Sequence, residues 1–142
     1  MGTPEFAATC LETLLNGRHE VVGVVTAPDR ESGRGRIITQ SEVKKIALER
    51  GLPIAQPEHL RSEKFLDLLK GWNADLGVVV AFRMLPEVVW SMPEMGTVNL
   101  HGSLLPQFRG AAPIQRAIMA GATESGATTF LLTGDIDKGD IL

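Results

Sequence analysis

Val21-Val22-Gly23-Val24-Val25-Thr26 is a short run of apolar, mostly β-branched residues. Such a run is typical of a strand that is buried on both faces of a sheet. The segment before it repeats apolar residues at helical spacing from Thr3 and stops at Asn16-Gly17. We expect Thr3 to cap this helix and Pro4 to occupy its first position. A helix that leads into a buried strand is the repeating unit of a parallel α/β sheet.

The same alternation of helices and strands continues along the chain. Further helices are predicted over 41–50, 62–71, 86–90 and 112–120, and further strands over 53–56, 76–81, 97–101 and 128–132. The connections are too long for hairpins and indicate right-handed crossovers between parallel strands. The sequence therefore predicts a doubly wound, mostly parallel α/β sheet of the Rossmann-like kind. In this architecture ligands bind beyond the carboxyl ends of the strands.

Length and composition limit the class of protein. The 142 residues fit one domain, and a net charge of −3 with 44% hydrophobic residues excludes a basic nucleic-acid wrapper and a disordered tail. One cysteine and three dispersed histidines give no disulfide and no zinc spacing, so we expect no metal. No apolar run reaches the roughly 18 residues of a membrane span, and no secretory signal is present. We expect a cytoplasmic protein with no membrane or DNA partner.

Both ends of the sequence have an unusual local pattern. Met1-Gly2-Thr3-Pro4 has the character of a turn from a strand into a helix, yet only Met1 precedes it. At the other end, Asp140-Ile141-Leu142 has the character of a strand that is beginning. We therefore expect residues 1–142 to form most of one domain, with its first strand and its last segment missing.

The predicted strand 97–101 carries two residues of chemical interest. Asn99 and His101 are two positions apart, so they share a face at the carboxyl edge of the sheet. An amide donor beside an imidazole can stabilise an oxyanion while a proton moves. A purely structural role is the commoner outcome for such a pair taken alone.

An acidic segment follows the predicted strand 128–132. Asp135, Asp137 and Asp140 lie where a carboxylate can return to the edge that carries His101. One of them could orient the imidazole and increase its basicity, although Gly-Asp and Lys-Gly steps are also ordinary material for a solvated turn. Spacing alone does not rank the three aspartates.

Four ordered motifs resemble those of a known family. Asn99-x-His101-x-Ser103-Leu104-Leu105-Pro106, followed by Asp137 in an Ile-Asp-Lys-Gly context, resembles the signature of the folate-dependent formyltransferases. Residues 2–7 (GTPEFA), 28–35 (PDRESGRG) and 109–116 (RGAAPIQR) are similar to the methionyl-tRNA formyltransferases within that family. The resemblance covers nearly the whole chain.

The resemblance implies an activity and a catalytic trio. The implied reaction transfers a formyl group from 10-formyltetrahydrofolate, the co-substrate, to the amino group of methionyl initiator tRNA for translation initiation. Asn99 and His101 would donate to the oxygen that gains charge, while Asp137 would position His101 and help the proton to move. The family needs no metal. It is expected to be monomeric when whole, with a carboxy-terminal tRNA-binding domain that is absent from this chain.

The resemblance also assigns residues to binding. Segment 80–86 is similar to the loop that seats the pterin ring, although periodicity alone favours a core strand there. The residues implied to bind folate are Phe82, Arg83, Met84, Leu85, Ser103, Leu104, Leu105, Pro106, Gly134 and Asp135. In the glycine-punctuated basic loop over 28–36, Arg30, Arg34 and Arg36 are implied to contact the tRNA acceptor arm. Without the resemblance, a solvated loop is the commoner interpretation.

Two other classes of function stay open from the motifs. The catalytic trio alone also fits formyltransferases that act on a ribonucleotide or sugar-nucleotide amine, or hydrolysis of formyltetrahydrofolate. The basic loop and the segment 111–116 argue against these. A non-catalytic nucleotide-binding α/β module is the other class, and the lack of a Gly-x-Gly-x-x-Gly motif after a strand weakens it.

Overall fold

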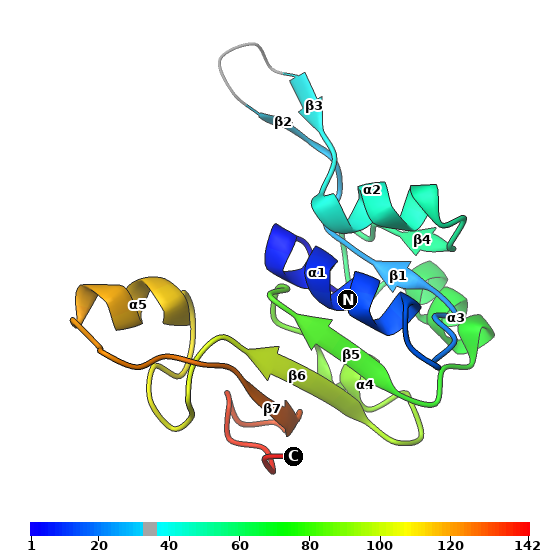
Figure 1. Cartoon of the computed structure of the whole chain (residues 1–142). Helices are drawn as coiled ribbons and strands as arrows, with labels where there is room; N and C mark the ends of the chain where they lie inside the picture. Colours follow the sequence, from blue (N-terminus) through cyan, green and yellow to red (C-terminus); the bar gives the residue numbers. More distant parts are fainter. Residues whose placement is uncertain (33–36) are drawn as a thin grey trace.

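A computed structural model describes residues 1–32 and 37–142 (Figure 1). The helices are α1 (Glu5–Leu15), α2 (Glu42–Glu49), α3 (Glu63–Trp72), α4 (Glu87–Trp90) and α5 (Pro113–Met119). The strands are β1 (Val24–Val25), β2 (Arg30–Ser32), β3 (Ile37–Thr39), β4 (Ile54–Ala55), β5 (Gly77–Val80), β6 (Thr97–His101) and β7 (Thr128–Leu131). Each helix lies within one or two residues of its predicted position.

The residues that precede α1 connect two groups of strands. β1 pairs in parallel with β4, and β5 pairs in parallel with β6. Between these pairs lie Met1 and Gly2: the Gly2 N–H donates to the carbonyl of Val25 at 3.0 Å, and the Val80 N–H donates to the carbonyl of Met1 at 2.9 Å. The amino terminus is therefore seen between β1 and β5 in Figure 1.

Helices cover both faces of this arrangement. Val24 and Val80 pack with α1 and α2 in one hydrophobic core. Their neighbours Val25 and Val79 point to the opposite face and pack with α3 and α4 in a second core. Because neighbouring residues of a strand point to opposite faces, short apolar strands supply both cores at once. The prediction of a doubly wound α/β fold is confirmed.

Three predictions about local structure need correction. β7 pairs antiparallel with β6, so the sheet is parallel only up to that strand. Arg30–Ser32 lie in the region predicted as a loop, but they form β2 and pair antiparallel with β3. The predicted cap Thr3 is also wrong, because Pro4 occupies the N-cap position of α1 without a side-chain hydrogen bond.

The antiparallel pair β2–β3 projects from the body of the domain (Figure 1). Its base is fixed by Asp29, whose carboxylate lies 2.5 Å from Lys44 Nζ and accepts a hydrogen bond of 2.8 Å from Gln56. The hydrogen bond from Lys44 is the main reason that the pKa of the Asp29 carboxyl is below its usual value. α2 thus anchors the segment that begins at Arg30, and Ser41 caps α2 as predicted.

Gly77 allows β5 and β6 to approach closely. A Cβ at this position would lie 2.4 Å from Thr97 Oγ1 and 3.0 Å from Thr97 Cβ. We expect Gly77→Ala to lower the free energy of unfolding by about 1–3 kcal/mol, because the added methyl group forces these strands apart. Gly71→Ala is the matched control, since no atom lies within 4 Å and alanine favours α3 by about 0.5–1 kcal/mol. Denaturant unfolding measures both, and equal effects would contradict this packing.

In a polypeptide that consists of residues 1–142, burial of the Met1 amino group predicts a dependence of stability on pH. Its nitrogen donates to the Val78 carbonyl at 2.6 Å, and desolvation lowers its pKa from 8.0 to about 6. Between these values the unfolded chain binds more protons than the folded chain. The free energy of unfolding should therefore rise from pH 6 to pH 8 by up to about 3 kcal/mol and then level off. NMR titration of ¹⁵N-labelled Met1 checks the pKa directly, and an ordinary value near 8 would contradict the prediction.

Candidate active site

Asn99 and His101 project from β6 at its carboxyl end. Leu100, between them, packs against the core formed with α1 and α2, so Asn99 and His101 point to the opposite face. His101 is buried, with 7% of its surface exposed, whereas Asn99 is half-buried. No hydrogen bond of the Asn99 side chain is found among the residues that the structure describes. Its amide is therefore available to a ligand.

Asp137 lies beside His101. The distance from His101 Nδ1 to Asp137 Oδ2 is 3.7 Å, and Nε2 on the other side of the ring lies 3.0 Å from the carbonyl oxygen of Phe108. Since that carbonyl can only accept, Nε2 carries the proton in this arrangement. The imidazole thus lies between one carboxylate and one backbone carbonyl, and the carbonyl accepts its hydrogen bond.

The Arg109 side chain and the Gly110 backbone fix Asp137 in turn. The Gly110 N–H donates to Asp137 Oδ2 at 2.6 Å, and Arg109 Nε donates to the Asp137 carbonyl at 2.9 Å. The other two aspartates of this segment are exposed, and Asp135 pairs with Lys138 at 3.6 Å. The structure therefore singles out Asp137 as the carboxylate near His101, a choice that residue spacing leaves open.

Three residues around His101 have left-handed backbone conformations. Phe108, Ala112 and Asp137 have φ angles of 54°, 52° and 50°. This region is unfavourable for residues with a side chain, and such strain persists only where the surroundings enforce it. Strained residues cluster at functional sites, so their gathering here supports a functional role for this end of β6.

Thr128 of β7 fixes the loop that follows β6. Its hydroxyl donates to the Ser103 carbonyl at 2.7 Å and accepts a hydrogen bond of 3.0 Å from the Leu105 N–H. The Ser103 hydroxyl, which is buried, donates to the carbonyl of Gln107 at 2.6 Å. Two of the predicted folate-binding residues, Ser103 and Leu105, therefore have hydrogen-bond partners within the protein. Leu104 and Pro106 of the same loop are exposed.

A separate cavity of about 610 Å³ contains four of the predicted folate-binding residues. They are Arg83, Met84, Leu85 and Gly134. The Arg83 guanidinium donates to the carbonyls of Pro57 and Glu58 and lies 5.6 Å above the Phe82 ring. The segment after β4, including Glu58 and His59, supplies another wall that sequence analysis does not include. Gly134 brings the acidic segment to this cavity, and its neighbour Asp135 is exposed.

The predicted tRNA-binding arginines can be placed only in part. Arg30 is exposed at the start of β2, on the projecting pair of strands. Arg34 and Arg36 lie outside the described residues.

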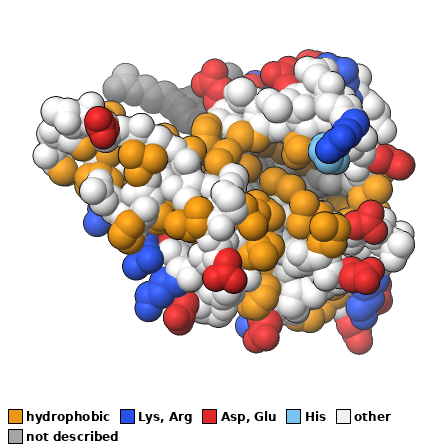
Figure 2. All heavy atoms as spheres, turned by 60° about the horizontal axis from the view of Figure 1, so that its bottom comes forward, with side chains coloured by type: hydrophobic (Ala, Val, Ile, Leu, Met, Phe, Trp, Pro, Cys, Tyr) orange, Lys and Arg blue, Asp and Glu red, His pale blue; other side chains and the backbone are white. Residues whose placement is uncertain are grey.

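Figure 2 shows a hollow in the surface that is surrounded by hydrophobic side chains. Acidic side chains lie mostly along the outer edge of this face of the molecule.

Residues 1–32 and 37–142 contain no group of three or more histidine, cysteine, aspartate or glutamate side chains placed to hold a metal ion. No helix in the same ranges has the length and apolar character needed to cross a membrane. Cys10 is half-buried in α1, and burial raises the pKa of its thiol. A protonated thiol is a poor nucleophile, which agrees with a structural role for this residue.

Fold and site together define an α/β enzyme domain. A buried histidine beside a carboxylate lies at the carboxyl ends of the strands, where doubly wound folds bind their ligands, and a cavity of ligand size lies on a neighbouring loop. The model of the formyl transferase family matches residues 1–142. The chain belongs to this family.

Sequences and structures that resemble this chain carry related names. A methionyl-tRNA formyltransferase of Bacteroides fragilis is 56% identical over 142 residues, and one of Bacteroides thetaiotaomicron is 57% identical. In both cases the match covers 100% of this chain, and the chain spans 44% of the relative's length. Phosphoribosylglycinamide formyltransferase from Bacillus halodurans has a similar structure, with a TM-score of 0.76 at 20% identity over 99% of this chain and 73% of that one.

The hydroxyl of Thr128 provides a test of how the loop after β6 is held. Thr128→Val removes both of its hydrogen bonds and leaves the Leu105 N–H without a partner. We expect the free energy of unfolding to fall by about 1–3 kcal/mol. Thr129→Val is the matched control on the same strand, and its effect should stay within about 0.5 kcal/mol. Denaturant unfolding of both variants gives the comparison, and an equal loss would show that the hydroxyl of Thr128 does not fix the loop.

Proposed function

We propose that residues 1–142 are the catalytic domain of an enzyme that transfers a formyl group from 10-formyltetrahydrofolate to methionyl initiator tRNA in the cytoplasm. The identity of 56–57% to methionyl-tRNA formyltransferases over the whole chain is the observation that carries the proposal. The contact between His101 and Asp137 supports it, because these residues come from segments 36 positions apart and meet at one edge of the sheet.

The chemistry required of the site is attack of an amine on a formyl carbon. A bond forms from the methionine nitrogen to that carbon, and the bond from the carbon to the folate nitrogen breaks. Negative charge develops on the formyl oxygen between these events. Donors that are already oriented toward such an oxygen lower the barrier most effectively. In this proposal Asn99 supplies a side-chain N–H, and His101 supplies Nε2–H after exchanging the Phe108 carbonyl for the substrate oxygen.

Asp137 has two tasks in this mechanism. Its carboxylate faces Nδ1 of His101 and stabilises the ring when both ring nitrogens carry a proton, and it is itself oriented by the Gly110 N–H. It also provides a base near the attacking amine, which must lose a proton before the folate nitrogen can leave with one. A carboxylate with a fixed orientation suits the transfer, because little reorganisation is then needed as the charge moves.

The substrates are assigned to two surfaces. The cavity beside Arg83, Met84 and Leu85 is proposed to seat the folate, because its lining combines apolar side chains with charged ones. The tRNA acceptor arm is proposed to follow the projecting segment that begins at Arg30 and includes Arg34 and Arg36. Phosphate contacts by arginine would position the tRNA without reading its sequence.

A ribonucleotide amine is the second candidate acceptor. The similar solved structure from Bacillus halodurans is named for phosphoribosylglycinamide, but at 20% identity it supports the fold alone. Both acceptors present an amine to the same carbon, so the trio does not distinguish between them. The distinction rests on the much higher identity to the tRNA enzymes.

A chimeric enzyme tests the proposal. Residues 1–142 replace the matching segment of the Bacteroides fragilis relative, and formylation is measured with methionyl initiator tRNA or phosphoribosylglycinamide as the acceptor. We expect formylation of the tRNA-linked methionine. Asn99→Ala, His101→Ala and Asp137→Asn should each lower kcat/KM by at least about 100-fold, since each removes a group that acts in the transition state.

Two variants serve as matched controls for the trio. His19→Ala and Asp67→Asn make similar changes at exposed positions, and they should leave the rate unchanged. Transfer to phosphoribosylglycinamide with no transfer to tRNA would assign the chain to the other acceptor. Equal losses in the control and site variants would remove the trio from the mechanism.

A further inference from the structure

α5 packs against the residue that follows His101. A Cβ at Gly102 would lie 3.2 Å from Ile114 Cγ1 and 3.6 Å from Pro113 Cγ. Ala117, one turn further along the helix, is buried. These contacts fix α5 beside the candidate active site, so a side chain of this helix has a fixed starting point close to His101.

The Arg116 side chain extends from α5 to the residues that hold Asp137. Its Nη1 donates to the carbonyl of Arg109 at 2.7 Å. Side chains of an α-helix lean toward its amino end, which is the direction of this contact. The guanidinium is always charged, and a hydrogen bond from a charged donor is roughly twice as strong as one between neutral groups. Arg116 therefore has a specific backbone partner, although its side chain is exposed.

The carbonyl that Arg116 contacts belongs to the same peptide unit as the Gly110 N–H. That N–H donates to Asp137 Oδ2 at 2.6 Å. Because a peptide unit is planar, its carbonyl and its N–H turn together. A donor on the carbonyl also polarises the unit, which makes the N–H a stronger donor. Arg116 thus acts on the Asp137 carboxylate from the far side of one peptide unit.

Packing does not fix the orientation of this peptide unit. Gly110 has a φ angle of 89°, and no atom lies within 4 Å of the position that a Cβ would take. Glycine adopts many backbone conformations at little cost, so hydrogen bonds must set the orientation here. In the described part of the chain, the Gly110 N–H is the hydrogen-bond donor found for the Asp137 carboxylate. The neighbouring Lys138 pairs with Asp135 instead.

We propose that Arg116 is a positioning residue for formyl transfer: it orients and polarises the peptide unit between Arg109 and Gly110, whose N–H in turn orients the Asp137 carboxylate. The inference rests on the proposed function, in which Asp137 is the partner of His101 and the base near the attacking amine. Arg116 itself contacts no reacting atom. Loss of its hydrogen bond should therefore slow the chemical step and leave substrate binding unchanged.

Arg116→Met in the chimera with the Bacteroides fragilis relative tests this role. Methionine keeps an unbranched side chain but removes the donor and the charge. We expect kcat to fall by about 10-fold, because a small displacement of a catalytic group is costly, while the KM values for 10-formyltetrahydrofolate and methionyl initiator tRNA stay within about twofold. Arg116→Lys keeps a charged donor, and one nitrogen is enough for this contact. It should retain at least about a third of the kcat.

The amide proton of Gly110 reports directly on the hydrogen bond. In the chimera labelled with ¹⁵N-glycine, this proton should resonate at low field, because the N–H donates to a carboxylate over a short distance. Arg116→Met should move the signal upfield, and Arg116→Lys should return it toward its original position. The measurement needs no substrate. Its failure is therefore distinct from failure of the proposed function, which would appear as a lack of tRNA formylation by the unsubstituted chimera.

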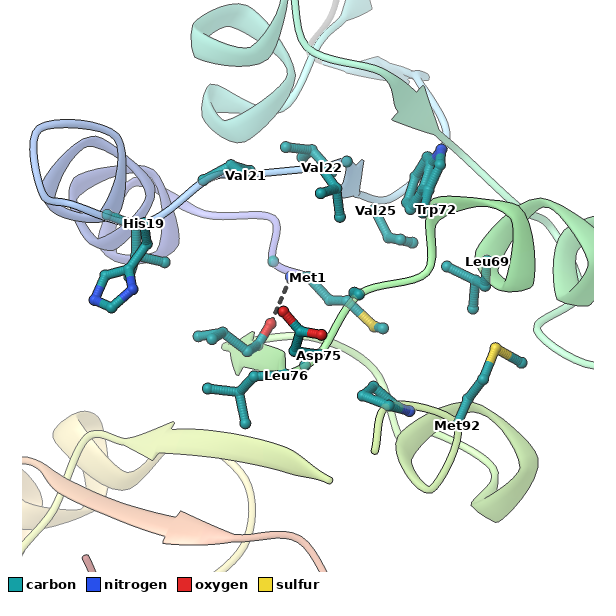
Figure 3. Close-up of a pocket in the computed structure, with 18 of the residues that line it drawn as sticks. Met1, His19, Val21, Val22, Val25, Leu69, Trp72, Asp75, Leu76 and Met92 are labelled. Atoms are coloured by element: carbon teal, nitrogen blue, oxygen red, sulfur yellow. Dashed lines mark hydrogen bonds between the residues drawn. The ribbon is translucent and has the colours of Figure 1, made fainter. Parts of the chain in front are cut away.

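Two variants serve as matched controls for Arg116. Arg50→Met removes an exposed arginine at the end of α2 and should change neither kcat nor the Gly110 signal. Leu76→Ala shortens an apolar side chain of the cavity of about 850 Å³ that Figure 3 shows, at the opposite end of β5 and β6 from His101. It should lower the Tm without moving the Gly110 signal. This variant separates a general loss of stability from a loss of positioning.

Three results would overturn the proposal. A higher KM for the tRNA with an unchanged kcat would make Arg116 a direct contact of the tRNA. An unmoved Gly110 signal in Arg116→Met, or a moved signal with an unchanged kcat, would show that the peptide unit does not carry the effect to Asp137. An equal fall in kcat in Leu76→Ala would assign the loss to stability alone.

Discussion

Backbone hydrogen bonds of Met1 and Gly2 hold the two halves of the sheet together. Gly2 donates to Val25 of β1, and Met1 both donates to and accepts from β5. The approach is so close that a Cβ at Gly2 would lie 2.5 Å from the Ala7 Cβ and 2.8 Å from the Val80 carbonyl oxygen. Glycine is thus required at position 2, where the chain passes from the sheet into α1. The two cores and the relative positions of β1 and β5 depend on this junction.

The candidate site depends on the other half of the sheet, through the antiparallel return of β7. That return places Thr128 beside the loop after β6 and directs the acidic segment back toward His101. Phe130, opposite Asn99, is fully buried and fixes the register of the two strands. The site is therefore built from segments whose positions are set by strand pairing. The loops after β6 and β7 then add the hydrogen bonds that orient each side chain.

Sequence patterns were sufficient for the helices, for the approximate positions of β1 and β4 to β7, and for the face that carries Asn99 and His101, because these depend on local periodicity. They could not rank the three aspartates, since only the path of the chain after β7 decides which one meets the imidazole. They also missed Thr128, the Phe108 carbonyl and the Gly110 N–H. A backbone group leaves no trace in residue identity, and Thr128 acts on a loop 23 or more positions earlier. The pairing of β2 with β3 was missed because an Arg-Glu-Ser strand has little apolar character.

The two ends of β5 are held by different backbone hydrogen bonds. Met1 secures β5 at Val78 and Val80, which is the end that leads into the Arg83 loop and its cavity. The opposite end, from Gly77, pairs with β6. Doubly wound folds bind their ligands at the carboxyl ends of their strands. The short junction thus orders the half of β5 that supports the site, while the other half relies on packing against α3 and the neighbouring strand.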